Sequence, residues 1–341
     1  AGIASSVALA DNNSLDSERA EANKALIHDI LADADNRASF MQGGSSISVN
    51  VHGFVQNRWT YSDNDGDATH GFSIPRTRLI ISGDAHNWDY TVSGQWDDGD
   101  SFTLKDAYFG TDLAGWGLRA GQFKTPFMAE VLVSQADTLA IESSVISNQF
   151  GQGRSQGIEL SRDLGPATFT GSYTDGFNTA NGAGVENGSA ITGRLEFGLM
   201  GWVDLGVAAS YNDLDDTDYN TWTVDATMLW NGLDLTGAYV ATVDDTNGDG
   251  WGTVWTAAYQ CTNKMQGFVQ YERGHLDGVS DDLSVATVGV NYAVNNNVMW
   301  TTDLGYSYNS IDSAWDLGNS GWDATTNDGE YLVRSQIQVK F

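Results

Sequence analysis

The sequence predicts an all-β fold, namely a 16-stranded antiparallel transmembrane β-barrel with an inward-folded third loop and a short N-terminal helix. The first observation is composition: the 341 residues include 39 Gly, 12 Trp and 13 Tyr but only 3 Pro, and charged residues make up 18%. The second is a two-residue alternation of apolar and polar side chains from residue 46 onward. The third is that no run of 18 apolar residues exists, so transmembrane helices are excluded, whereas barrel strands need only about 9–11 residues.

Residues 1–10, AGIASSVALA, resemble the end of a signal peptide. Ala8-Leu9-Ala10 has the small-x-small pattern that precedes signal-peptidase cleavage. We therefore predict a signal-peptide remnant at 1–10, a mature chain that starts at Asp11, and export from the cytoplasm.

Residues 11–45 are predicted to form an amphipathic helix and a linker. Residues 14–37 contain neither Gly nor Pro, and Leu26, Ile27, Ile30 and Leu31 recur at helical spacing. An isolated helix of about 20 residues is only marginally stable. We therefore expect it to pack in a trimeric bundle or in the barrel mouth, or to tether the barrel to peptidoglycan.

Residues 46–341 are predicted to form the barrel. In the last strand, Tyr331, Val333, Ile337, Val339 and Phe341 face one way, and polar residues face the other. In a barrel the apolar side meets lipid and the polar side lines water. Sixteen runs of this kind are predicted, at 46–61, 71–84, 88–97, 101–113, 115–124, 155–163, 166–175, 188–199, 201–212, 219–230, 233–243, 251–260, 264–273, 283–293, 297–308 and 330–341.

The predicted connections alternate between two kinds. One kind is short, and Asn231-Gly232 is its strongest hairpin signal. The other kind is longer and acidic, from 62–70 through 309–329. Short turns at one end and long loops at the other are typical of outer-membrane barrels. An even strand count places both termini of the barrel domain at the short-turn, periplasmic side, and sixteen strands leave a water-filled channel.

Charge and reactive residues exclude several functions. A formal net charge of −29 argues against nucleic acid as a partner. A single cysteine, Cys261, excludes an intramolecular disulfide framework. Of five histidines only His52 lies inside a predicted strand, without a nucleophile beside it, so we predict that the chain is not an enzyme. A barrel hydrolase is the minor alternative.

The connection 125–154 differs from the other long ones because it is rich in apolar residues, such as Leu132, Ile141 and Ile146. A loop in water does not need these side chains, but a loop that packs on the inner barrel wall does. This observation predicts the inward-folded third loop.

Four stretches resemble the porin O/P family of outer-membrane porins, in its version with an N-terminal helical prefix. They are RTRLIISGD (76–84), LKDAYFGTDL (104–113), LRAGQFKTPFMAE (118–130) and GRSQGIEL (153–160). The resemblance implies sixteen strands, a homotrimer among outer-membrane lipids, and a third loop that narrows the pore. It also implies passive diffusion of small hydrophilic solutes and ions.

Strand parity and loop position predict the residues that line the pore. Those on the wall or at the loop ends are basic, and those on the third loop are acidic; the full set is Arg58, Arg76, Arg78, Lys105, Arg119, Lys124, Glu130, Asp137, Glu142, Arg154, Arg194 and Arg334. Phosphate-selective members of the resembled family cluster Lys and Arg at the constriction, whereas this third loop is acidic. We therefore expect a weakly selective, near-neutral or cation-preferring pore, with an anion (phosphate)-selective porin as an alternative.

Two acidic segments resemble incomplete calcium loops. Asp245, Asn247 and Asp249 fit the first half of the motif, although its twelfth position is Thr256 rather than Glu, and Asp63, Asp65 and Asp67 are similar. No cofactor is required by the sequence, and Ca²⁺ at the outer loops is one interpretation of these residues. Solvated turns are the other.

The outer loops and the chain end lead to two more expectations. A structural or adhesive barrel, whose acidic loops bind surface polymer or divalent cations, is the main rival function. Phe341, as an outward-facing aromatic residue at the end of the last strand, is expected to be the signal that the barrel assembly machinery reads.

Overall fold

The computed structural model describes residues 47–64, 67–97, 101–182, 188–214, 217–244, 246, 248–325 and 327–341. The chain divides into two compact units, Ala1–Ser48 with Asp84–His86, and Val49–Gly83 with Asn87–Phe341. Within the first unit, Ile47 forms an antiparallel bridge with Ala85. The predicted signal-peptide remnant and N-terminal helix lie outside the described residues.

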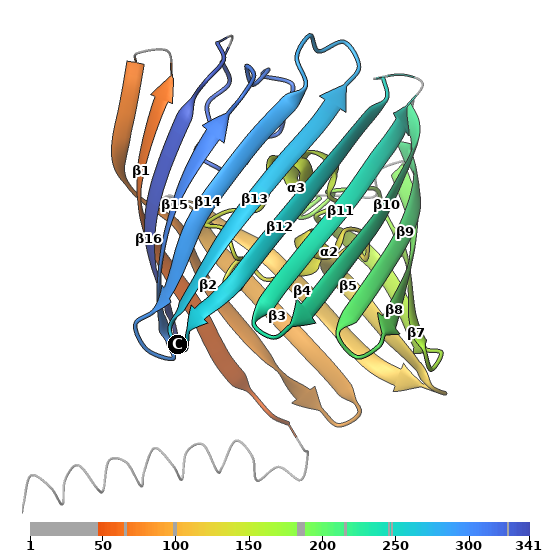
Figure 1. Cartoon of the computed structure of the whole chain (residues 1–341). Coiled ribbons are helices and arrows are strands. Elements are labelled where there is room, and N and C mark those ends of the chain that lie inside the picture. The colour runs from red at the N-terminus through yellow and green to blue at the C-terminus, as the bar shows by residue number, and fades with distance from the viewer. Residues whose placement is uncertain are drawn as a thin grey trace, which may run out of the picture. The chain divides into compact units, whose positions relative to one another are not determined.

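The second unit is a closed antiparallel barrel in which each strand pairs with its neighbours in the chain and the last pairs with the first (Figure 1). The predicted sixteen strands are confirmed. Their bounds are β1 Asn50–Asn64, β2 Asp67–Ala85, β3 Trp88–Asp97, β4 Ser101–Leu113, β5 Trp116–Lys124, β6 Arg154–Asp163, β7 Ala167–Thr174, β8 Gly188–Leu199, β9 Val203–Leu214, β10 Thr217–Trp230, β11 Leu233–Asp244, β12 Gly250–Thr262, β13 Met265–Leu276, β14 Leu283–Ala293, β15 Val298–Ser307 and β16 Tyr331–Lys340. Two short helices, α2 (Ala129–Leu132) and α3 (Val145–Phe150), lie between β5 and β6.

The outer face of the barrel is apolar. In β16, Ile337 and Val339 are 51% and 41% exposed. Gln336 and Gln338, which alternate with them, are each 6% exposed. A water-soluble protein rarely exposes a continuous surface of large apolar side chains. Such a surface fits contact with lipid, and the alternation along each strand produces it. Within the described residues, no helix is long and apolar enough to cross a membrane.

Tight turns connect neighbouring strands at one end of the barrel. In Ala114-Gly115, Met200-Gly201 and Asn231-Gly232, both residues have positive φ, for example 49° and 80° in the last pair. This conformation is that of the type I′ turn, whose twist matches that of the flanking strands. The Asn231-Gly232 hairpin is therefore confirmed.

Two of the predicted long connections are wrong. β1 continues to Asn64 and β2 begins at Asp67, and β9 continues to Leu214 with β10 beginning at Thr217. The acidic segments 62–70 and 213–218 are therefore mostly strand. Beyond the lipid both faces of a strand meet water, so the apolar alternation that marks a membrane strand disappears there.

The chain end closes the barrel against β1. Phe341 N donates to Gly53 O at 3.0 Å, and Gly53 N donates to Phe341 O at 2.9 Å. The Phe341 side chain is 57% exposed on the outer side. No strand edge is left free between β16 and β1. The role of Phe341 in assembly stays a prediction.

Candidate functional site

The segment 125–153 runs inside the barrel (Figure 1). Its side chains Phe127, Met128, Val145 and Ile146 are at most 1% exposed. They form one hydrophobic cluster with inner-wall residues of other strands, namely Ala208, Ala238, Val240, Val254, Leu283, Val285 and Leu332. Burial of this apolar face holds the segment on one side of the lumen.

Glycines make that side of the wall flat enough for α3. A Cβ atom on Gly252 of β12 would lie 2.7 Å from two atoms of Ile146. A Cβ atom on Gly274 of β13 would lie 2.7 Å from Ile146 and 2.6 Å from Trp315. Glycine inside a strand often marks such a close approach.

A valine at position 274 is therefore expected to push α3 and Trp315 off the wall, at a cost of about 1–3 kcal/mol for overpacking. Limited proteolysis of the folded barrel should then cleave the segments 145–150 and 309–325 faster. Gly267→Val on the same strand is the control, because the nearest atom to its Cβ would be 4.0 Å away. Equal cleavage of the two variants would contradict this account of packing.

Internal hydrogen bonds stiffen the inward segment. Glu130 accepts from Ser144 N at 2.8 Å and from the hydroxyls of Ser144 and Ser147 at 2.7 and 2.6 Å. At the segment's start, Lys124 Nζ donates to Val133 O at 2.6 Å. Glu130, predicted to line the pore, thus braces the two helices against each other.

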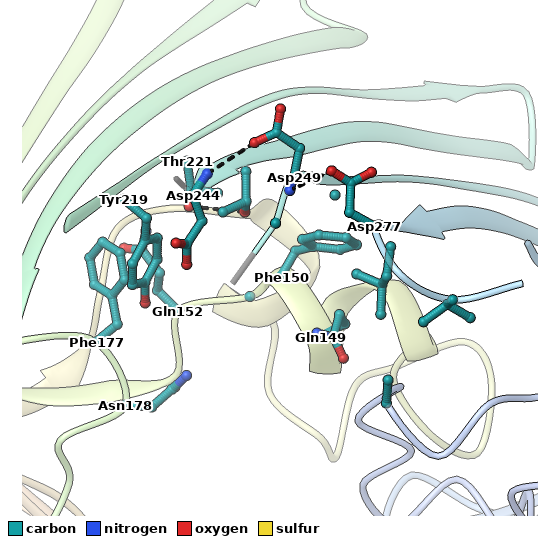
Figure 2. A pocket seen from close by; sticks show the side chains of 17 residues that line it. Gln149, Phe150, Gln152, Phe177, Asn178, Tyr219, Thr221, Asp244, Asp249 and Asp277 are labelled. Atoms are coloured by element: carbon teal, nitrogen blue, oxygen red, sulfur yellow. Dashed lines mark hydrogen bonds between the residues drawn. The ribbon is translucent and has the colours of Figure 1, made fainter. Parts of the chain in front are cut away.

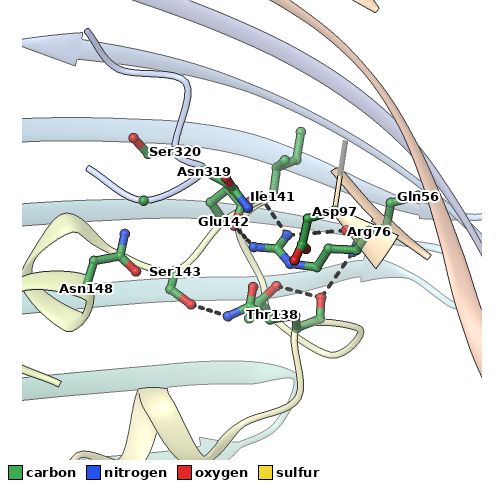
Figure 3. Close-up of polar contacts among 12 residues, drawn as sticks. Gln56, Arg76, Asp97, Thr138, Ile141, Glu142, Ser143, Asn148, Asn319 and Ser320 are labelled. Carbon is green, nitrogen blue, oxygen red and sulfur yellow. Dashed lines mark hydrogen bonds and ion pairs between the residues drawn. The ribbon is translucent and has the colours of Figure 1, made fainter. Parts of the chain in front are cut away.

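Glu142 clamps the segment to β1 and β2 of the wall (Figure 3). Its carboxylate accepts from Arg76 Nη1 and Nη2 at 2.7 and 2.6 Å and also pairs with Arg58. The side chains of Glu142 and Arg58 are 4% and 3% exposed. Burial alone would raise the pKa of Glu142, but the charges of Arg76 and Arg58 and their hydrogen bonds outweigh burial and lower the pKa below its ordinary value.

Further basic side chains continue from this clamp across β2, β4, β5 and β6. We name seven residues the basic arc; they are Arg58, Arg76, Arg78, Lys105, Arg119, Lys124 and Arg154. Arg78 donates to Gln95 Oε1 at 2.8 Å, and Lys105 Nζ lies 3.7 Å from Asp97 Oδ2. These seven residues lie on β1, β2, β4, β5 and β6, and their role in lining the pore stays a prediction.

Two members of the basic arc make ion pairs that are closer than the pair of Lys105 and Asp97. Arg154 donates to both carboxylate oxygens of Asp106 at 2.9 and 3.0 Å. Arg119 lies 3.1 Å from Glu159 and over the ring of Tyr108, 4.6 Å from its centroid. Seven cations therefore face four paired carboxylates: Asp97, Asp106, Glu142 and Glu159.

Two other predicted arginines serve mainly to hold structure. Arg194 donates to both oxygens of Asp225 at 2.8 and 2.7 Å and to Phe127 O at 2.5 Å. Arg334 donates to both oxygens of Asp303 at 2.8 Å. Their charges are neutralised by these neighbours, so they act as anchors for loops.

A second loop enters the lumen, and strand parity did not predict it. This final loop, residues 309–329, reaches the clamp through its backbone. Arg58 Nη1 donates to Asn319 O at 2.9 Å, and Arg334 Nη1 donates to Ser320 O at 2.6 Å. Together the third loop and the final loop occupy the lumen beside the basic arc.

Apolar side chains of the final loop also pack inward. Ile311, Trp315 and Trp322 are 0%, 4% and 6% exposed, and the Trp315 ring meets that of Phe150 at 6.1 Å and 76°. A loop that stayed in water would not need two tryptophans. This signal was present in the sequence, and it is the same one that identified the third loop.

Asp137 lines one cavity together with Glu130 and Glu142, but its ion pair is made outside the basic arc. It pairs with Lys340, and the two side chains are 58% and 42% exposed. Sequence reasoning also missed the partners of the basic arc, of which Asp106 and Gln95 are the most directly involved. Their position could be inferred from strand parity, but their pairing could not.

The candidate metal ligands do not gather in the part of the chain that the structure describes. Asp65, Asp245 and Asn247 lie outside the described residues, while Asp63 and Asp67 belong to β1 and β2. Asp249 accepts from Asp244 N at 3.1 Å. Among described residues, no group of three metal-binding side chains is present, and Ca²⁺ at these loops stays a prediction.

Comparison with known proteins identifies a family. A family model described as Gram-negative porin matches residues 1–312. No curated protein sequence matches the chain.

Solved structures share the fold at low identity. An anion-selective porin from Comamonas acidovorans is 15% identical with a TM-score of 0.71, covering 87% of this chain and 100% of that one. The OmpF of Salmonella typhi in complex with daunomycin is 15% identical with a TM-score of 0.66, covering 86% and 97%. The trimer form of OmpT from Vibrio cholerae is 10% identical with a TM-score of 0.64, covering 86% and 99%.

Proposed function

The chain belongs to the Gram-negative porin family, and from this premise we propose that the basic arc and the third loop form the constriction of a weakly selective diffusion pore. The family and the barrel make it a passive channel of the outer membrane. The observation that carries the proposal is the Glu142 clamp. It holds the third loop against β1 and β2, and Lys124 of the arc also donates to a carbonyl of the loop.

The charges of the constriction support weak selectivity. The basic arc carries three more charges than its four carboxylate partners, which favours anions at the waist. The chain as a whole has a formal charge of −29, which enriches cations at the mouth. Because these effects oppose each other, we propose a near-neutral pore for small hydrophilic solutes and ions, without catalytic activity.

Planar-bilayer recording tests the proposal. A purified pore should give stepwise currents and a reversal potential near zero in a KCl gradient. A barrel that only bound surface polymer would give no steps, and a strong anion preference would contradict weak selectivity.

Neutralising the exposed cations of the basic arc should shift selectivity towards cations. Lys105→Gln is suitable, because Lys105 is 23% exposed and its partner Asp97 is 31% exposed, so the substitution leaves no buried partner charge without solvent. A unit charge about 4 Å from an ion is worth about 1 kcal/mol in water, so the permeability ratio should change by up to about fivefold. Lys264→Gln, in a turn outside the arc, is the control, and an equal shift there would contradict the assignment.

Two finer statements are part of the same proposal. The V. cholerae OmpT structure in trimer form supports a homotrimer. The four motifs of residues 76–160 support membership of the porin O/P group, while the acidic third loop argues against phosphate specificity. Cross-linking of the purified protein to a trimer band would test the first.

A further inference from the structure

A second cavity lies at the end of the barrel that carries the long connections. It has a volume of about 400 Å³ and is bounded by α3, the ends of β10 and β11, Gly248 and Asp249 after β11, and residues that follow β7 and β13 (Figure 2). Its size falls within the range of about 300–1,000 Å³ that is usual for small-molecule sites. It is separate from the basic arc, none of whose residues lines it.

Three carboxylates give this cavity a fixed negative charge. Asp244 Oδ1 accepts from Thr246 N at 2.8 Å, and Asp249 Oδ1 accepts from Asp244 N at 3.1 Å. Asp277 Oδ2 accepts from Asp249 N at 3.1 Å. Among the described residues that line the cavity there is no Lys, Arg or His. Backbone amides thus hold the three side chains in place, and Asp277 Oδ1 also lies 3.5 Å from His275 Nε2.

Aromatic rings form the other side of the cavity. Figure 2 shows the Asp244 carboxylate pointing into the space between Tyr219 and Phe150. Phe177 meets Tyr219 edge to face, with centroids 5.3 Å apart and an interplanar angle of 71°. Phe177 and Phe150 are 8% and 7% exposed, so the rings are held by their surroundings. Aromatic faces attract cations as well as apolar carbon.

We propose that this vestibule pocket binds small organic cations that carry a primary ammonium group next to an aromatic or apolar portion. The ammonium group is held by the Asp244 and Asp249 carboxylates, and the apolar portion lies against Phe150 and Tyr219. Neutral analogues lose the ion pair, and anionic analogues are repelled. The inference rests on the proposed function only in that the small cation reaches the pocket through the water-filled mouth of the pore.

The test is equilibrium binding to the purified full-length protein in detergent, with EDTA present so that metal ions do not compete. Three probes of similar size are compared: 2-phenylethylammonium, 2-phenylethanol and phenylacetate. We expect the ammonium compound to bind best and phenylacetate to bind least. Asp244→Asn should weaken ammonium binding about tenfold, as expected when a hydrogen bond to a charged group is lost, while binding of the alcohol stays unchanged.

Asp163→Asn is the matched control. Asp163 also accepts from a backbone amide two residues ahead, Gly165 N at 2.7 Å, but it lies at the short-turn end. This variant should bind all three probes as the parent does. Equal affinity for the ammonium compound and the alcohol, or equal weakening by Asp163→Asn and Asp244→Asn, would overturn the proposal.

Bilayer recording separates this inference from the proposed function. If the purified protein gave no conductance but still bound the ammonium compound best and phenylacetate least, the proposed pore would be contradicted and the pocket would not. If the protein conducted normally but bound the three probes equally well, the pocket would be overturned and the proposed pore would not.

Discussion

Replacement of Glu142 by glutamine is expected to widen the pore and to shift its selectivity towards anions. The carboxylate pairs with both Arg58 and Arg76. Removing one partner of a buried ion pair typically costs about 3–5 kcal/mol, because the remaining charge is left buried. Here that cost is relieved if the third loop moves away and water reaches both arginines.

Single-channel conductance and the reversal potential in a KCl gradient measure both effects. Glu196→Gln is the matched control: Glu196 also pairs with an inner-wall arginine, Arg194, but is 49% exposed, and Arg194 keeps Asp225. Control and parent should agree. If Glu142→Gln conducted like the parent with the same ion preference, the clamp would not define the constriction.

Acid should not reproduce this substitution within the mild range. The folded-state pKa of Glu142 is lowered, so its contribution to stability is complete above the ordinary glutamate pKa and is lost only as pH falls through the lowered value. The clamp should therefore stay in place between about pH 7 and pH 5, a range that lies above the ordinary glutamate pKa of about 4.3. A conductance step inside that range that Glu142→Gln abolished would contradict the assignment of the clamp.

Shortening the final loop is expected to give the second large effect, an increase in conductance. Thr325 N donates to Ile311 O at 2.8 Å, so the two ends of the loop meet and residues 312–324 can be replaced by two glycines. The change removes the carbonyls of Asn319 and Ser320 from Arg58 and Arg334. Water then fills the part of the lumen that the loop occupies in the parent, and the side chains of the two arginines can move more freely.

Trp315→Ala tests whether the packing of the final loop on the wall, rather than the space that the loop fills, limits conductance. Truncation of a buried Phe or Trp to Ala typically costs about 3–5 kcal/mol, so this variant should release the loop from Phe150 without deleting it. We expect conductance that fluctuates between the level of the parent and that of the shortened variant. Parental conductance in the shortened variant would mean that the final loop lies outside the ion path.

The sequence alone determined the barrel and much of its geometry. Alternation in segments such as 331–341 follows from the two-residue repeat of a strand, and it decides which side chains face lipid and which face the lumen. Turn chemistry at Asn231-Gly232 is equally local, because the backbone conformation depends on those two residues. Parity therefore predicted Arg58, Arg76, Arg78, Lys105 and Arg119 by residue number, while Lys124 and Arg154 were predicted from their place at the ends of the third loop.

Only the tertiary structure decided which of those charges remain available for permeating ions. Arg58 and Glu142 are 84 positions apart, and Arg58 and Asn319 are 261 positions apart. Their meeting depends on the curvature of the barrel, on glycines such as Gly274 that let α3 approach the wall, and on the inward course of the final loop. A local period specifies the direction of a side chain, but a partner across the lumen is specified only when the whole ring of strands closes.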